Sequence, residues 1–93
     1  MQLAYFWADC SDGSHVAVNY AVHEDRVTGS IRRWSRDTRI NTGRKFEVPA
    51  EQIASGDGGR PTMTLDGICT EPVRIVLDPR AVAESGFSWK TAA

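Results

Sequence analysis

The residues best suited to binding chemistry lie in one basic segment near the middle of this 93-residue chain. Between Arg26 and Lys45 the sequence holds seven of its eleven Lys and Arg residues and a single acid. Residues 1–25 hold four acids and no Lys or Arg, and residues 46–93 hold seven acids against four bases. A net charge of −1 therefore conceals a polarised molecule. A positive segment that includes Trp34 is typical of a surface that contacts a partner.

Cys10 is the one candidate nucleophile with possible activating groups near it in the sequence, namely Asp9, Asp12 and His15. A cysteine attacks as the thiolate, so it needs a neighbouring base or cation. Such partners are normally brought together by the fold rather than by proximity along the chain, and residues 11–14 are typical of a turn. The other acids are scattered singly. We therefore expect no catalytic residues and no enzyme activity, and a cysteine- or metal-dependent enzyme is the third of three function hypotheses.

The soft metal ligands of the chain are Cys10, His15, His23 and Cys69. In an extended strand His15 and His23 would lie about 26 Å apart, which is too far for one metal ion. No C-x-x-C spacing is present, and the glycine-rich residues 55–61 lack the G-x-x-x-x-G-K-[ST] pattern of a phosphate-binding loop. We therefore expect neither a metal nor a cofactor.

Composition places the chain among ordinary soluble globular domains, with 41% apolar and 25% charged residues. Its length predicts a single domain over residues 1–93. The apolar run at residues 3–8 is far shorter than the ~20 residues that cross a bilayer, and the N-terminus lacks the features of a secretory signal. We therefore expect no membrane association and a cytoplasmic location. In that reducing compartment Cys10 and Cys69 are predicted to be free thiols; the alternative is one disulfide between them, which would matter only if the chain is exported.

Alternating apolar residues predict a chain dominated by strands. The clearest case is residues 15–23, where Val and Tyr side chains alternate with small or polar ones over nine positions. Similar patterns predict strands at residues 3–9, 27–34, 39–48, 62–68 and 73–77. Asp78 and Pro79 are typical of a helix start, and Gly86 of a helix end. The predicted fold is α+β and β-dominated: an antiparallel sheet of about five to six strands with one short C-terminal helix.

Two four-residue loops would pair the three middle strands so that their apolar faces match. This register sets Val18 opposite Ile31, and Trp34 opposite Arg39. The opposite face of the sheet then collects eight polar or aromatic residues: His15, Asn19, Ser30, Arg32, Trp34, Arg39, Asn41 and Lys45. In this arrangement the Arg39 guanidinium could lie over the Trp34 ring.

Arg33 and Arg44 fall on the apolar side of the predicted sheet. Either they lie at the rim of the sheet, or a bulge at Gly43 shifts the register. The pattern leaves both alternatives open.

The basic and aromatic face supports two function hypotheses ahead of the enzyme. The first is a small protein-binding module, such as an inhibitor, accessory subunit or adaptor, that engages an acidic surface of a protein partner. The alternative is binding to RNA or single-stranded DNA, with Trp34 stacked on a base. A pI of about 6.1 and a single aromatic on that face argue against nucleic acid. The predicted contact residues are Arg32, Trp34, Arg36, Arg39, Asn41 and Lys45.

Overall fold

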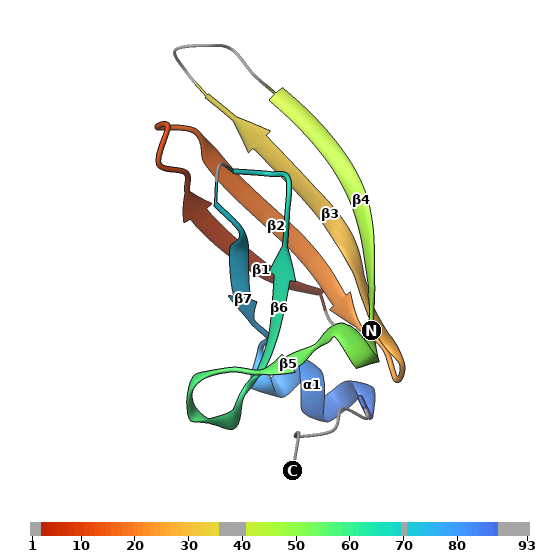
Figure 1. Ribbon diagram of the computed structural model, residues 1–93. Helices are drawn as coiled ribbons and strands as arrows, with labels where there is room; N and C mark the ends of the chain where they lie inside the picture. The colour runs from red at the N-terminus through yellow and green to blue at the C-terminus, as the bar shows by residue number, and fades with distance from the viewer. Residues whose placement is uncertain (1–2, 36–40, 70, 88–93) are drawn as a thin grey trace.

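The computed structural model describes residues 3–35, 41–69 and 71–87, which form two antiparallel sheets and one short α-helix (Figure 1). The larger sheet has the order β1 (Leu3–Asp9), β2 (His15–Val22), β3 (Arg26–Trp34) and β4 (Asn41–Pro49). The smaller sheet has the order β5 (Ala54–Ser55), β6 (Pro61–Leu65) and β7 (Val73–Val76). Two 3₁₀ turns, η1 (Ala50–Gln52) and η2 (Asp57–Gly59), flank β5, and α1 (Pro79–Ser85) follows β7.

The β-dominated α+β class and the short C-terminal helix are confirmed, but the prediction of one sheet with five to six strands is wrong. The strands divide between two sheets after β4. Pro49 ends β4, and η1 begins at the next residue. Because proline cannot donate a ladder hydrogen bond, it is suited to the end of a strand where the chain leaves a sheet. The period-two pattern marks strands but does not say which sheet each strand joins.

The hydrophobic core lies between the two sheets. The larger sheet contributes Val16, Val18 and Val27, and the smaller sheet contributes Met63 and Ile75, all with no exposed surface. Successive side chains of a strand point to opposite faces, so the alternating valines of β2 all reach this core. Burying side chains of this size stabilises the fold by about 1.5–3 kcal/mol each relative to exposure.

Gly29 is required by a close approach inside the larger sheet. A Cβ atom at this position would lie 2.1 Å from the backbone oxygen of Asn19 and 2.8 Å from the Phe46 ring. Gly29 pairs with Phe46 in the register, so the ring covers the space that a side chain would fill. Phe46 also packs against the core.

The β2–β3 register is the predicted one, with Val18 opposite Ile31 and Val22 opposite Val27. The predicted β3–β4 register is wrong by two residues, because Trp34 lies opposite Asn41 rather than Arg39. Six residues rather than four separate the two strands. A shift of two leaves every side chain on its predicted face, since the period of a strand is two.

The two inward arginines lie at the rim of the sheet, and no bulge occurs at Gly43. The β3–β4 ladder runs without interruption from Arg26 to Trp34. Arg33 donates to Asp12 and Ser14, in the loop that connects β1 and β2. Arg44 donates to the backbone oxygen of Asp66 at 3.1 Å. Both guanidiniums therefore connect the rim of the larger sheet, at the ends of its strands, to loops instead of entering the core.

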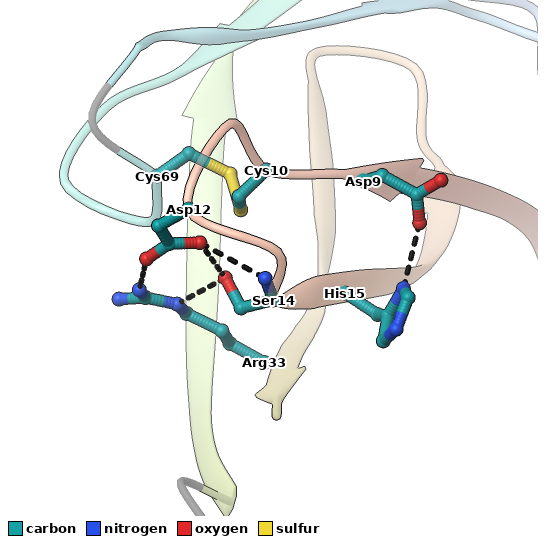
Figure 2. A network of polar contacts seen from close by, with 7 residues as sticks. All are labelled: Asp9, Cys10, Asp12, Ser14, His15, Arg33 and Cys69. Carbon is teal, nitrogen blue, oxygen red and sulfur yellow. Dashed lines mark hydrogen bonds and ion pairs between the residues drawn. A yellow bond between two sulfur atoms is a disulfide. The ribbon is translucent and has the colours of Figure 1, made fainter. Parts of the chain in front are cut away.

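Cys10 and Cys69 form a disulfide, so the prediction of two free thiols is wrong. Cys10 follows β1, and Cys69 lies between β6 and β7, so the bond joins the two sheets (Figure 2). Stacking of the sheets brings the two Cα atoms to 5.5 Å, a proximity that their separation of 59 residues does not reveal. Disulfides persist mainly in oxidising compartments, so the bond differs from what a cytoplasmic location led us to expect; the location itself stays a prediction.

The predicted helix ends are confirmed for α1. The Asp78 side chain accepts a hydrogen bond from the Arg80 amide at 2.9 Å, Pro79 occupies the first turn, and Gly86 adopts a left-handed conformation. The Asp78 amide in turn donates to the Tyr20 hydroxyl at 2.9 Å, which ties the helix to β2. Burial raises the pKa of Tyr20 above its ordinary value of 10.0. Phe87, which follows Gly86, is buried in the core.

No helix among the described residues is both long and apolar enough to cross a bilayer.

Candidate binding surface

The outer face of the larger sheet, which points away from the smaller sheet, carries a row of exposed apolar side chains on β1. Leu3, Tyr5 and Trp7 occupy alternate positions of this strand and expose 55%, 64% and 69% of their surface. The residues between them, Ala4 and Phe6, point to the core side. β1 is also an edge strand, with β2 on one side only. The row therefore lies at a border of the sheet, open to contact from outside.

Trp7 reaches across the sheet to Trp34 on β3. Their ring centroids lie 5.8 Å apart, and the two ring planes are nearly perpendicular at 89°. Ala17 of β2 pairs with Trp7 and lies between the two strands. Because its side chain is a single methyl group, it leaves room for the rings to meet above it. Edge-to-face contact of this kind adds about 0.5–1.5 kcal/mol beyond the area it buries.

His15 connects this aromatic pair to a carboxylate. Its Nδ1 atom lies 2.7 Å from Asp9 Oδ1 (Figure 2). Its ring centroid lies 5.7 Å from that of Trp34, and the two ring planes are tilted by 39°. Asp9 and Trp34 are the two register partners of His15, on β1 and β3. The Asp9 side chain nevertheless exposes 82% of its surface, so the carboxylate can still be reached by a ligand. Together with Trp7, these side chains line a cleft at one end of the face.

The structure brings together part of the predicted contact set. Arg32 and Lys45 are exposed on the outer face, and Trp34 is half-buried there. Asn41 lies opposite Trp34 in the register, at the place predicted for Arg39. Arg36 and Arg39 lie outside the described residues.

The described part of the outer face carries charges of both signs, although the sequence predicts a basic one. Arg26 and Arg32 on β3 and Lys45 on β4 share this face with Asp9 on β1 and Glu47 on β4. Arg26 lies 2.8 Å from Asp25 and 3.7 Å from Glu47. Arg33 and Arg44 contact loops at the rim of the sheet. The positive charge of the segment is thus divided between the outer face and the rim.

A shallow depression occupies the centre of the outer face, where β2 and β3 carry small side chains. Ala21, Thr28 and Ser30 form its floor, between Leu3 on β1 and Lys45 on β4. The hollow is local to these small side chains, because β3 carries the larger Arg32 and Trp34 further along the same face. Its remaining lining residues are Asn19, Gly29, Phe46 and Glu47.

Arg33 and its partners form a polar cluster beside the disulfide, at the end of the sheet (Figure 2). Asp12 accepts hydrogen bonds from the side chain and the backbone amide of Ser14, the latter at 2.9 Å, and pairs with Arg33. The hydrogen bonds of Ser14, with a further contribution from the Arg33 charge, hold the pKa of Asp12 below its ordinary value of 3.8. This cluster fixes the β1–β2 loop against β3.

The residues that the sequence offers as a nucleophile or as metal ligands do not form a reactive centre in the part of the chain that is described. Cys10 is bonded to Cys69 and so is not a thiolate. His23 contacts the Thr28 hydroxyl at 2.7 Å. Within residues 3–35, 41–69 and 71–87, no three His, Cys, Asp or Glu side chains are grouped so that they could hold a metal ion.

Sequence reasoning missed Tyr5 and Trp7 as surface residues. The signal was present, because Leu3, Tyr5 and Trp7 share one parity of the predicted strand and Ala4 and Phe6 share the other. Both parities are apolar, however, so the alternation alone does not say which one faces the core. Only the pairing of β1 with β2 decides it, since Tyr5 lies opposite Asn19.

Comparison of the chain with protein-family models, with curated proteins and with solved structures found no match.

Proposed function

We propose that the chain is a small non-catalytic protein-binding module, of the inhibitor, accessory or adaptor type, and that it binds its partner through the outer face of the larger sheet. Contact would centre on the aromatic patch, defined here as Leu3, Tyr5, Trp7 and Trp34. Arg32 and Lys45 would lie at its margin.

The observation that carries this proposal is the exposure of large apolar side chains on one face. Of the four large hydrophobic residues that are exposed among those described, Leu3, Tyr5 and Trp7 belong to the patch, and only Val76 lies elsewhere. Exposing such residues side by side is unfavourable in water unless a partner covers them. Trp and Tyr are also enriched among the residues that contribute most to the affinity of protein interfaces.

Charge would orient the partner more than it would add affinity. Arg32 and Lys45 favour an acidic group on the partner at the β3–β4 side of the face. Arg36, Arg39 and Asn41 stay further contacts proposed from the sequence; Arg36 and Arg39 lie outside the described residues. Asp9 favours a positive group at the β1 side, so the partner surface would carry both signs.

Binding to RNA or single-stranded DNA is a second candidate, because the structure adds two rings to the face. Tyr5, Trp7 and Trp34 would give three stacking surfaces, where the sequence predicts only Trp34. Asp9 and Glu47 on the same face would repel phosphates. If nucleic acid is the target, affinity for a mixed-sequence oligonucleotide should fall steeply with rising salt. Weak binding that changes little with salt would exclude this candidate.

The proposal is tested by retention of the native partner on immobilised variants. Wild type and Val76→Ala, which removes an exposed apolar side chain from the other sheet, should retain the same partner from a native extract. Trp7→Ala should weaken the purified complex by about 2 kcal/mol, as the loss of a buried aromatic anchor does. Equal affinity of Trp7→Ala and Val76→Ala for that partner would contradict the proposal.

A further inference from the structure

We infer that the cleft between Trp7 and Trp34 binds an organic ammonium group, which the partner presents as a lysine side chain. This inference rests on the proposed function and adds the chemistry of one contact. The cleft is lined by Trp7, Ala8, Asp9, His15 and Trp34.

The geometry of the two indoles favours a cation. The perpendicular rings, with centroids 5.8 Å apart, meet edge to face, and a group bound in the corner beside this contact would touch the uncovered part of each ring face. The face of an aromatic ring carries partial negative charge, so a cation in this corner is attracted by two ring faces at once. The alkyl part of the ammonium group gains contact with the same apolar walls.

A carboxylate completes the site. Asp9 lines the cleft and exposes 82% of its side chain, while one oxygen is held by His15 at 2.7 Å. Its charge complements an ammonium group and would repel a carboxylate or phosphate.

One base of the chain itself lies beside the cleft and would compete with such a ligand. Arg32 lies on the same face of β3 as Trp34, two residues away, and opposite Ala17. Removal of the Arg32 charge should therefore strengthen binding of the ammonium group, while removal of the Asp9 charge should weaken it.

The first test uses choline as the probe, with indole N–H signals followed by NMR at constant ionic strength. Choline should shift the Trp7 and Trp34 signals saturably, with a dissociation constant on the order of millimolar. Its neutral isostere 3,3-dimethylbutan-1-ol, in which carbon replaces the nitrogen, should bind about tenfold more weakly. Equal binding of the two probes would overturn the inference, because it would show an apolar cleft without preference for charge.

Variants locate the site. Asp9→Asn should weaken choline binding severalfold, Arg32→Gln should strengthen it, and Trp7→Leu should abolish the shift at Trp34. Glu71→Gln removes an exposed acid outside the cleft and serves as the matched control, with no change expected. Unchanged binding in Asp9→Asn would overturn the role of the carboxylate.

Competition with the partner identifies the source of the ammonium group. Saturating choline should displace the native partner, and acetylation of the partner's lysines should weaken the complex, because acetylation removes the charge. Choline that binds the cleft without displacing the partner would overturn the assignment to a lysine. If choline does not bind but Trp7→Ala still loses the partner, the cation site fails while the proposed function stands.

Discussion

The two faces of the larger sheet are built from alternate residues of the same strands, but the inner face forms the core and the outer face is exposed to solvent. On the inner face Val16, Val18 and Val27 have no exposed surface. On the outer face Tyr5 and Trp7 expose well over half of theirs. A step of one residue along a strand thus separates a side chain that holds the fold from one that is available to a partner. Stability and recognition should therefore respond to different substitutions within a single strand.

The largest effect is expected from the bond that holds the smaller sheet over the inner face. Replacing both Cys10 and Cys69 by Ser should lower the free energy of unfolding by about 4 kcal/mol, because the bond closes a long loop in the unfolded chain. Chemical denaturation of the oxidised wild type and of the double variant would measure the difference. Choline binding at low temperature should persist if the outer face depends only on its own strands. Identical denaturation midpoints would show that the bond is absent in solution.

Within β3, Ile31 and Arg32 are neighbours on opposite faces, so substituting each of them compares how much the two faces contribute to stability. Ile31→Ala should lower the free energy of unfolding by about 2–5 kcal/mol, because it leaves a cavity in a core position that is 3% exposed. Arg32→Ala should change it by less than about 0.5 kcal/mol, as is usual for surface substitutions. Urea titrations of the two variants would test this. Similar losses from both would mean that the outer face also contributes to the fold.

The assignment of residues to the two faces was largely predictable, whereas the pairing of distant segments was not. Val16, Val18, Val27 and Ile31 could be placed inside because the alternation in β2 and β3 has one apolar side only. β1 is apolar on both sides, so its outward aromatics required the structure. The local signals around Asp78 were sufficient for α1, because capping depends on neighbouring residues.

Long-range contacts account for the remaining errors. The disulfide, the split into two sheets and the six-residue β3–β4 connection all depend on how sheets stack or loops close, and neither composition nor periodicity records that. The candidate surface was half predicted for the same reason. Trp34 and Arg32 were found on one strand, while Trp7, Asp9 and the perpendicular ring pair depend on β1 lying beside β2.

A smaller effect is expected at the opposite end of the core, where the Tyr20 hydroxyl accepts a hydrogen bond from the Asp78 amide. Tyr20→Phe should cost about 0.5–1.5 kcal/mol at neutral pH, the usual net value of one such bond. Burial raises the pKa of Tyr20, so above pH 10 the unfolded chain loses this proton while the folded chain keeps it. Wild-type stability should therefore fall as the pH rises above 10.

Tyr20→Phe should remove that part of the alkaline loss of stability. Thermal melts from about pH 8 to about pH 11, a range that spans the ordinary tyrosine pKa of about 10, would measure it. Tyr5→Phe is the matched control, since Tyr5 is exposed on the outer face. An unchanged alkaline slope in Tyr20→Phe would contradict the burial argument.

The smallest effect concerns consecutive arginines that use their charge differently. Arg32 lies on the outer face, and Arg33 lies at the rim, where it pairs with Asp12 in the cluster beside the disulfide. The pKa of Asp12 is lowered, first by the hydrogen bonds from Ser14 and then by Arg33. A lowered folded pKa contributes stability that is present above the unfolded value of 3.8 and is lost as the pH falls below it toward the folded value.

Wild-type stability should therefore decline on acidification below about pH 4, and Asp12→Asn should flatten this decline, because its side chain has no proton to take up. Arg33→Gln should flatten it only in part, since the hydrogen bonds of Ser14 remain, and Arg32→Gln should leave it unchanged. Urea titrations across this pH range would separate the three variants. Choline binding at neutral pH should be altered by Arg32→Gln alone, because the Asp12 cluster lies outside the Trp7–Trp34 cleft. If Arg33→Gln altered the binding and Arg32→Gln the acid stability, the division of the two faces between recognition and folding would be wrong.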